Sequence, residues 1–325
     1  MPIINTAIVG ASGYTGKELI SILHNHPNVS LKKLIVRDPE AALNDARSNC
    51  LVSASDLVFD QSFEDSDEFD VIFFALPHYE SVDIIKKAKG IFGSKTVLID
   101  LSQDHRFHKH WQYGLSEWYE DEIASTNNIA NPGCFATGIQ LSLAPLAKLN
   151  LKDCMVFLTG LTGSTGAGKK LASTSHYSER NSNVSVYKLF EHQHMKEVSQ
   201  SLSLLGNNWN PDLHFVPMRA PWTRGIFLTI QIPIADFSQK QIERLYREAY
   251  QSSSFVRICD TEPTLKSVVG TNFTLIKPSI HQGVLHISAC FDNLVKGASG
   301  QAVQNMNIRF NFEHTLGLDL KPIYF

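Results

Sequence analysis

Along residues 1–130, short apolar runs alternate with stretches that suit a helix. The runs AIVG (7–10), LKKLIV (31–36), VIFFAL (71–76) and TVLIDLS (96–102) are rich in Val, Ile and Leu. This alternation is typical of βαβ units, in which helices join the strands of a parallel sheet. The pattern therefore predicts an α/β domain of the Rossmann type at the start of the chain.

A glycine-rich loop joins the first predicted strand to the first predicted helix. It reads GASGYTG (10–16) and leads into KELISILHNHP (17–27), which has an inward apolar stripe and ends at a proline. Glycines let a backbone approach a pyrophosphate, and a helix N-terminus favours its negative charge. The spacing is GxxGxxG and not GxGxxG, so a plain packing turn is the alternative. We expect a dinucleotide to contact the loop at Gly10, Ser12, Gly13, Tyr14, Thr15 and Gly16.

Arg37 stands at the end of the second predicted strand, in LIVRDPE. An acidic residue at this place binds the adenosine ribose of NAD, whereas an arginine suits the 2′-phosphate of NADP. Arg37 therefore favours NADP(H). Asp38 beside it leaves NAD open, and Arg37 as a solvated surface charge is the third interpretation.

The pattern changes after residue 133 to longer strands in which apolar and polar positions alternate. Examples are LHFVPMR (213–219), GIFLTIQIPI (225–234) and VLHISACFD (284–292). One amphipathic helix is expected over 238–250, where Ser238 and Gln241 form a capping box. These patterns predict an α+β domain with a largely antiparallel sheet.

The last stretch, GASGQAVQNMNIRFNF (297–312), has a glycine-rich start and then a helical pattern that could pack back on the first domain. We therefore expect a dinucleotide-binding domain over residues 1–132 and 295–325, and a catalytic and dimerisation domain over residues 133–294.

Composition narrows the kind of partner. The 325 residues carry a formal net charge of −3, and Lys and Arg form no cluster larger than a pair, so a nucleic-acid partner is not expected. The chain starts without a leader-like pattern and has no apolar run of membrane-spanning length, which predicts a cytoplasmic protein without membrane association. A small-molecule ligand is expected.

Five cysteines occur at wide and irregular spacings. Their odd number and the lack of CxxC favour reduced thiols over a disulfide framework or a zinc site. Cys154, Cys259 and Cys290 lie in or at the end of apolar strand patterns, and Cys50 follows a polar loop. Each is judged by its own surroundings.

Cys134 differs from the others because it follows a Pro-Gly turn. It stands in NPGCFATG (131–138), and the apolar segment 135–149 behind it suits a helix that Pro145 should bend or end. A helix N-terminus favours a thiolate, which is the nucleophilic form of cysteine. A small buried hydrophobe is the alternative for Cys134.

Histidines that could serve this cysteine lie in YKLFEHQHMKEV (187–198). His194 and Glu197 would share a face of a helix, so the carboxylate could orient the imidazole. His192 and His194 would share a face if the segment were extended. Metal binding is the other interpretation, but no further ligand cluster supports it.

Residues 163–169 fit GxxxxGK, the beginning of a P-loop. The next residue is Lys170, where the motif requires Ser or Thr to hold magnesium. A nucleoside-triphosphatase or kinase is therefore a weak alternative, although the loop could still present backbone N–H groups to an anion.

Together these stretches resemble the N-acetyl-γ-glutamyl-phosphate reductases, which belong to the aspartate-semialdehyde dehydrogenase superfamily. The resemblance runs nearly end to end. It is carried by GASGYTG (10–16), ALPH (75–78), DLSQDHRF (100–107), YGLSEWY (113–119), NPGCFATG (131–138), GSTGAGKK (163–170), HYSERN and YKLFEHQH (within 176–194), FVPMRAPWTRG (215–225) and DNLVKGASGQAVQ (292–304).

The resemblance implies an NADPH-dependent reduction of an acyl phosphate to a semialdehyde through a cysteine thioester. Cys134 would be the nucleophile, and His194 with Glu197 would give acid/base help. His192 is the rival proton donor. The resemblance also implies a homo-oligomer, either a dimer or a tetramer. Further cofactor contacts are implied at Leu76, Pro77, Gly163 and Asn293, and one or more substrate-binding cations among Arg106, Arg219 and Arg224, unless these arginines are solvated surface residues.

Two departures from the family pattern leave the substrate's N-acyl group open. Lys196 stands where the family usually has proline, and the loop 164–168 is longer than usual. An N-succinyl or lysine-pathway substrate, or aspartate-semialdehyde dehydrogenase activity, is the alternative within the enzyme class. A non-catalytic dinucleotide-binding regulator is the alternative outside it.

Overall fold

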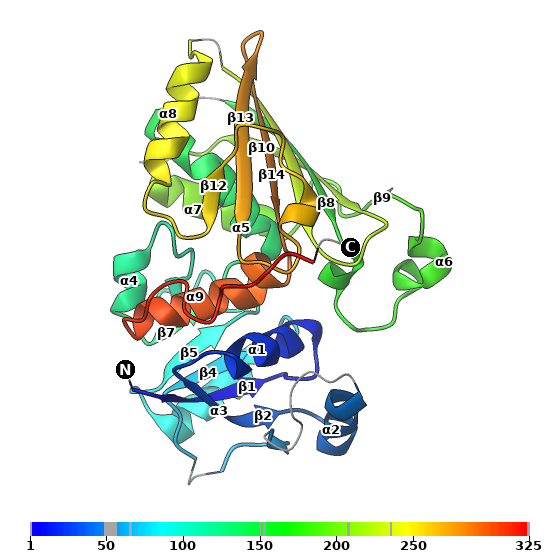
Figure 1. Ribbon diagram of the computed structural model, residues 1–325, viewed down its shortest axis with the longest axis vertical. Helices are drawn as coiled ribbons and strands as arrows, with labels where there is room; N and C mark the ends of the chain where they lie inside the picture. The colour runs from blue at the N-terminus through cyan, green and yellow to red at the C-terminus, as the bar shows by residue number, and fades with distance from the viewer. Residues whose placement is uncertain are drawn as a thin grey trace. The chain divides into compact units, whose positions relative to one another are not determined.

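Two seven-stranded sheets form the cores of two units of this chain (Figure 1). The computed structural model describes residues 2–48, 57–64, 67–149, 151, 154–206, 209–234 and 236–323. Unit 1 comprises Met1–Gly133 and Ala298–Leu320, and unit 2 comprises Cys134–Gly297 and Lys321–Phe325. Compared with the expected domain ranges, the chain enters unit 2 one residue later and leaves it three residues later. Its last residues return to unit 2, where the Ile323 N–H donates to the Val269 carbonyl at 2.8 Å.

The sheet of unit 1 has the strand order β3-β2-β1-β4-β5-β7-β6, and all the pairings between its described strands are parallel. Its strands are β1 Ile4–Val9, β2 Val29–Ile35, β3 Phe59–Asp60, β4 Val71–Phe74, β5 Val97–Asp100, β6 Gln112–Tyr113 and β7 Asn128–Ala130. Its helices are α1 Tyr14–His24, α2 Pro39–Ser48, α3 Ser81–Phe92, α4 Glu120–Ala124 and α9 Gly300–Arg309.

This unit is the predicted Rossmann-type domain. Strand β4 is buried along its whole length, as expected for a parallel strand covered on both faces. The four strands read from the sequence are present, whereas β3, β6 and β7 have only two or three residues and show no readable pattern. Helix α9 packs beside α1 (Figure 1), so the prediction that the last helix returns to the first domain is confirmed.

The sheet of unit 2 has the strand order β12-β13-β14-β11-β8-β10-β9. Two of its pairings, β8 with β10 and β12 with β13, are parallel, and the others are antiparallel. The prediction of a largely antiparallel sheet is therefore confirmed. Its strands are β8 Met155–Thr162, β9 Ser185–Val186, β10 Asp212–Arg219, β11 Ile226–Pro233, β12 Val256–Ile258, β13 Thr274–His281 and β14 Val284–Phe291.

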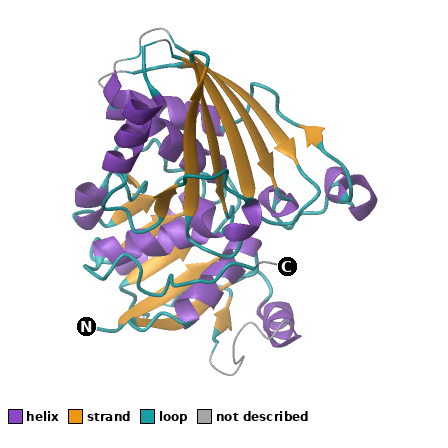
Figure 2. Ribbon diagram, turned by 45° about the horizontal axis from the view of Figure 1, so that its top comes forward, coloured by secondary structure: helices purple, strands orange, loops and turns teal. Residues whose placement is uncertain are grey.

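Helices cover one face of this second sheet (Figure 2). They are α5 Cys134–Leu143, α7 His194–Leu205 and α8 Gln239–Ala249, while the short α6 Tyr177–Arg180 lies in the connection before β9. Val156 and Leu158 of β8 point to the covered face and are buried, whereas Met155 and Phe157 on the opposite face are 48% and 43% exposed. The opposite face, which the described helices of unit 2 do not cover, thus carries Met155 and Phe157 together with polar side chains such as Thr229 and Gln231 of β11.

Two local predictions about helix ends are confirmed. Ser238 and Gln241 form the capping box of α8. Helix α5 begins at Cys134 and changes at Ala144 to a 3₁₀ turn that contains Pro145. Among the described residues, no helix combines the length and apolar character that crossing a membrane requires.

Candidate active site

The glycines of the loop in unit 1 have two different roles. Two of them are required by close packing, and the third faces open space. Gly10 has φ of +85°, and a Cβ there would collide with the Ala75 carbonyl oxygen. A Cβ on Gly16 would collide with the carbonyl oxygen of Gly10. At Gly13 the nearest atom to a Cβ would be 3.6 Å away, so the side-chain position is open. This opening is what a ligand that approaches the backbone needs.

The N-terminus of α1 is free to bind an anion. Gly13 is its N-cap, no side chain caps it, and its first turn has no acidic residue. The backbone N–H groups and the positive end of the helix dipole therefore remain for an external acceptor. Ser12 and Tyr14 are exposed and Thr15 is half-buried. These residues fit the diphosphate of a dinucleotide.

Arg37 and Asp38 have different partners at the end of β2. The Arg37 guanidinium is 86% exposed and forms an ion pair with Glu80 at 2.7 Å. The Asp38 carboxylate instead accepts the Ala41 N–H at 3.0 Å in the first turn of α2. Asp38 is thus engaged in helix capping, and Arg37 presents its charge at the sheet edge that carries the glycine loop.

Cys134 is the first residue of α5, as predicted, and its side chain is half-buried. Gly297 packs directly against it, because a Cβ on Gly297 would lie 3.0 Å from the Cys134 Cβ. The absence of a side chain at Gly297 keeps this side of the cysteine uncrowded. Cys134 therefore has the helix N-terminus that favours a thiolate.

The other described cysteines lack this setting. Burial raises the pKa of the Cys290 thiol to about 12 and also raises the pKa of Cys259. Cys154 lies half-buried just before β8, at no helix start. Cys50 lies outside the described residues. Since the thiolate is the nucleophile, Cys290 and Cys259 are poor candidates.

His194 and Glu197 lie in the first turn of α7, which confirms the predicted helical register. Both side chains are buried, as is His192 just before the helix. The His192 Nδ1 accepts the backbone N–H of His194 at 3.3 Å, so this imidazole caps the start of α7. Burial, assisted by the charge of Lys188, lowers the pKa of His192 to about 4. His192 is therefore a neutral acceptor at physiological pH.

The starts of α5 and α7 lie side by side. The Phe135 ring contacts the ring of His192 at a centroid distance of 5.5 Å and that of His194 at 6.5 Å. Because Phe135 follows Cys134 directly, this packing places the thiol and His194 on adjoining helix N-termini. Two groups that could exchange protons with a bound substrate thus belong to one region of unit 2.

Tyr187 joins the same region and was not singled out from the sequence. Burial first, and then the neighbouring Cys134, raise the pKa of its phenol, while Arg219 opposes the shift. The Arg219 guanidinium lies 4.9 Å from the centroid of the Tyr187 ring. The only sequence signal for Tyr187 was its place in the motif YKLFEHQH.

The three candidate substrate-binding arginines have different surroundings. Arg106 is buried in unit 1 and donates to the carbonyls of Asn131 at 2.9 Å and Leu101 at 3.2 Å. Arg224 is paired with the buried Asp292 at 3.0 Å. Arg219 is half-buried and donates to the Thr174 hydroxyl at 2.9 Å. Arg219 also lies against Tyr187, the residue whose pKa responds to Cys134.

Gly163 and Asn293 lie where the loop 163–168 contacts the loop 222–225 in unit 2. A Cβ on Gly163 would collide with the Thr223 carbonyl. The Asn293 side chain accepts the Gly225 N–H at 2.6 Å and donates to the Thr165 hydroxyl at 3.0 Å. Both residues thus have packing or bonding roles inside unit 2.

The P-loop interpretation of 163–170 fails on local geometry. The N–H groups of Gly163, Ser164 and Thr165 donate to carbonyls of the loop 222–225 and so do not form an anion cradle. The loop forms a 3₁₀ turn at Ser164–Ala167, and in the continuous described stretch 154–206 no α-helix begins directly after Lys169. A nucleotide-binding P-loop needs that helix.

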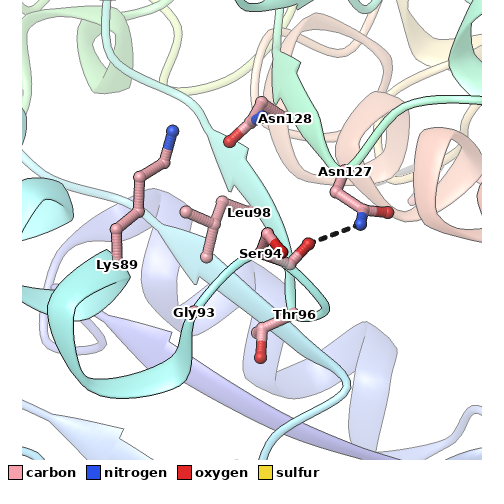
Figure 3. Close-up of a pocket in the computed structure, with 7 residues that line it drawn as sticks. All are labelled: Lys89, Gly93, Ser94, Thr96, Leu98, Asn127 and Asn128. Atoms are coloured by element: carbon pink, nitrogen blue, oxygen red, sulfur yellow. Dashed lines mark hydrogen bonds between the residues drawn. The ribbon is translucent and has the colours of Figure 1, made fainter.

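A cavity of about 330 Å³ lies at the amino ends of strands in the unit 1 sheet, opposite the ends that carry the glycine loop (Figure 3). It is lined by Lys89, Gly93, Ser94, Thr96, Leu98, Asn127 and Asn128. The Asn127 side chain closes part of it by donating to the Ser94 carbonyl at 2.7 Å. Thr96 and Asn128 stand at the amino ends of β5 and β7, whereas dinucleotides bind at the carboxyl ends. None of the predicted site residues lines this cavity. Within the described ranges, no group of three His, Cys, Asp or Glu side chains could hold a metal ion.

Comparisons with known proteins agree with this division of the chain. Residues 5–126 match the family described as "Semialdehyde dehydrogenase, NAD binding domain", and residues 134–293 match "Semialdehyde dehydrogenase, dimerisation domain". The N-acetyl-gamma-glutamyl-phosphate reductase of Phocaeicola vulgatus is 42% identical over 327 residues, covering 99% of this chain and 100% of that protein. The protein of the same name from Flavobacterium johnsoniae is 43% identical over 330 residues, covering 98% and 99%.

Solved structures share the fold at low identity. Aspartate semialdehyde dehydrogenase II of Vibrio cholerae complexed with ASA has a TM-score of 0.73 and 15% identity, covering 96% of this chain and 99% of that one. Aspartate semialdehyde dehydrogenase with NADP from Candida albicans has a TM-score of 0.66 and 15% identity, covering 94% and 98%.

Proposed function

Because this chain belongs to the semialdehyde dehydrogenase family, and within it to the N-acetyl-γ-glutamyl-phosphate reductases, we propose that it reduces N-acetyl-γ-glutamyl phosphate to N-acetylglutamate 5-semialdehyde with NADPH, a step of arginine biosynthesis. The observation that carries the chemistry is the position of Cys134 at the start of α5, beside the start of α7 with His194.

Cys134 performs the first half of the reaction. Its thiolate attacks the γ-carbonyl carbon of the acyl phosphate, the carbon–oxygen bond to phosphate breaks, and inorganic phosphate leaves with the bonding pair. An acyl thioester remains on the enzyme. Burial holds the pKa of Cys290 and Cys259 above the usual range, and Cys154 does not stand at a helix start, so Cys134 is the best placed of the described thiols.

NADPH, when held by the glycine loop, would supply a hydride, and the Cys134 thioester would accept it to give a thiohemiacetal. His194 donates a proton to the developing oxygen anion, and takes it back as the carbon–sulfur bond breaks to release the aldehyde and the Cys134 thiolate. Glu197, one turn along α7, orients the imidazole. His192 remains neutral and holds the backbone at the start of α7.

We assign substrate-anion binding to Arg219. Its guanidinium lies 4.9 Å from the centroid of the Tyr187 ring, and Cys134 is also a neighbour that affects the pKa of that phenol, so we place Arg219 and the thiol around the same tyrosine. Arg106 and Arg224 are instead engaged by backbone carbonyls and by Asp292. Replacement of Arg219 by methionine should raise KM for the acyl phosphate far more than it changes the Kd for NADPH.

The residues that bind the cofactor are those of the glycine loop and the end of β2. Gly13 gives the backbone access that a diphosphate needs, and the uncapped N-terminus of α1 provides the N–H donors. Asp38 caps the start of α2, and the exposed Arg37, which is paired with Glu80, is the cation that would meet a 2′-phosphate. NADPH is therefore favoured over NADH.

We also propose that two copies associate through the uncovered face of the unit 2 sheet. Met155 and Phe157 are exposed there, and the matching family region is described as a dimerisation domain. A Phe157→Glu variant should sediment as a smaller species than the wild type, because a buried unpaired charge opposes association.

The proposed function is tested by trapping the thioester. Enzyme mixed with N-acetyl-γ-glutamyl phosphate, without NADPH, should carry an acyl adduct on the Cys134 peptide in mass spectrometry. Cys134→Ser should lose both the adduct and turnover, because a hydroxyl has no comparable anion population at neutral pH. Cys259→Ser is the matched control and should keep both.

Two results would overturn the proposal: an adduct on another cysteine, or full turnover by Cys134→Ser. Parallel assays with the N-succinyl analogue and with β-aspartyl phosphate decide among the alternative substrates. Higher kcat/KM for either of these than for the N-acetyl substrate would reassign the specificity.

A further inference from the structure

Tyr79 combines an exposed aromatic ring with a backbone conformation that side chains disfavour. It lies between β4 and α3 with φ of +70°, in the left-handed region that few residues other than glycine adopt. Its side chain is 85% exposed, so burial of the ring does not explain the conformation. Strained residues of this kind persist where the surrounding structure holds them, and they concentrate at binding sites.

A carboxylate from the next strand holds this conformation in place. Asp104, in the loop after β5, accepts the Tyr79 N–H at 2.8 Å. The same carboxylate accepts the N–H of Ser81 at 3.2 Å and its hydroxyl at 2.8 Å. These bonds keep the segment rigid on both sides of Tyr79. The ring is thus presented at a defined place although it has little packing of its own.

Tyr79 lies at the carboxyl ends of the strands, where the proposed cofactor-binding residues also lie. Strand β4 pairs with β1, and Leu76 approaches the glycine loop closely enough to stand 3.4 Å from a Cβ built on Gly10. Glu80, the next residue after Tyr79, forms the ion pair with Arg37 at 2.7 Å. Tyr79 therefore lies beside the group that meets the adenosine 2′-phosphate.

We propose that the Tyr79 ring is a stacking platform for the adenine of the cofactor. This inference rests on the cofactor binding of the proposed function, and it assigns a new contact residue for the adenosine half. Adenine offers a flat face that an exposed phenol ring can cover, and each partner then loses water-exposed apolar surface. The carboxylate of Asp104 fixes the platform before the ligand arrives, so less freedom is lost on binding.

The test compares Tyr79→Asn with Tyr79→Phe by titration calorimetry with NADPH. Asparagine tolerates the left-handed conformation, so Tyr79→Asn removes the ring and keeps the loop. Its Kd should rise about tenfold, in line with loss of one aromatic–base stack. Its Tm without ligand should rise by roughly 2–4 °C, because backbone strain is relieved. Tyr79→Phe should bind as the wild type does.

Gln282→Asn is the matched control. Gln282 is also exposed with positive φ, +46°, but it lies in the β13–β14 turn of unit 2. This variant should gain stability without any change in the Kd for NADPH.

Titration with 2′,5′-ADP identifies which half of the cofactor the ring contacts. The same loss of affinity for 2′,5′-ADP as for NADPH supports the adenine assignment, and a loss for NADPH alone overturns it. An unchanged Kd for both ligands in Tyr79→Asn also overturns it. Failure of the wild type to bind NADPH would instead refute the proposed function, so the two failures are distinguishable.

Discussion

The role of His192 as a buried neutral acceptor can be tested by measuring the stability of the fold as the pH is lowered. His192 is 5% exposed, and its pKa is lowered from 6.5 to about 4, chiefly because burial disfavours the charged imidazole. The folded chain therefore keeps His192 neutral while the unfolded chain takes up a proton as the pH falls below 6.5. The stability of the fold should decrease as the pH falls from 6.5 to 4, and His192 should add no further pH dependence above or below that window.

The magnitude follows from the width of the window. Each pKa unit corresponds to about 1.4 kcal/mol, so His192 should cost the folded state roughly 2–3 kcal/mol at pH 4.5 relative to pH 7.5. Replacement by asparagine removes the titrating group and leaves an oxygen that can accept the His194 N–H. His192→Asn should therefore lose less stability than the wild type on acidification, by this amount.

Urea unfolding at pH 7.5 and pH 4.5, followed by circular dichroism, measures the difference. His281→Asn, at the exposed end of β13, is the control and should follow the wild type at both pH values. If His192→Asn and the wild type lose the same free energy of unfolding on acidification, the assignment of His192 as a buried neutral acceptor is wrong.

The same pair of histidines should separate in kinetics. His194→Asn should lower kcat about a hundredfold or more, since a positioned proton donor contributes on this scale. His192→Asn should keep most of kcat at pH 7.5, because the neutral His192 ring accepts a backbone hydrogen bond and is not protonated to act as an acid at this pH. If His192→Asn alone abolished turnover, the two roles would have to be exchanged.

The cofactor site yields two further predictions. Arg37→Ala should weaken NADPH binding by about ten- to a hundredfold and leave NADH nearly unchanged, as measured by calorimetry, because only NADPH has the 2′-phosphate; equal losses would contradict the assignment. Gly13→Ala should keep the wild-type Tm but bind NADPH more weakly, since its Cβ fits the fold and fills the open position, whereas Gly16→Ala should lower Tm through its collision with the Gly10 carbonyl. A Gly13→Ala variant with unchanged NADPH affinity would show that the ligand does not approach there.

Local patterns in the sequence were enough to predict the elements that carry the site. The alternation of apolar runs and helices identifies the parallel sheet, and turn chemistry at Asn131–Gly133 places Cys134 at the start of α5. The three-residue spacing of His194 and Glu197 predicts their common helix turn. Such features depend on neighbours within a few residues, so the order of residues determines them.

Only the tertiary structure distinguishes among histidines and arginines that the sequence leaves as equal candidates. Which histidine is neutral depends on burial by Phe135 and Phe215, which lie far from His192 in the chain. Which arginine lies against Tyr187, and which one is paired with Asp292, likewise depends on the folded chain. No local pattern encodes these contacts, because they form only when β10, β14 and α5 come together.

The same holds for the cofactor edge. Arg37 and Asp38 are adjacent in sequence. Only in the folded chain does Arg37 pair with Glu80 while Asp38 accepts a hydrogen bond at the start of α2. The strain at Tyr79 is likewise invisible in the sequence, because Asp104 that holds it comes from a different strand end. Periodicity and turn chemistry act over a few residues, whereas burial, charge pairing and backbone strain are set by groups that only the folded chain brings together.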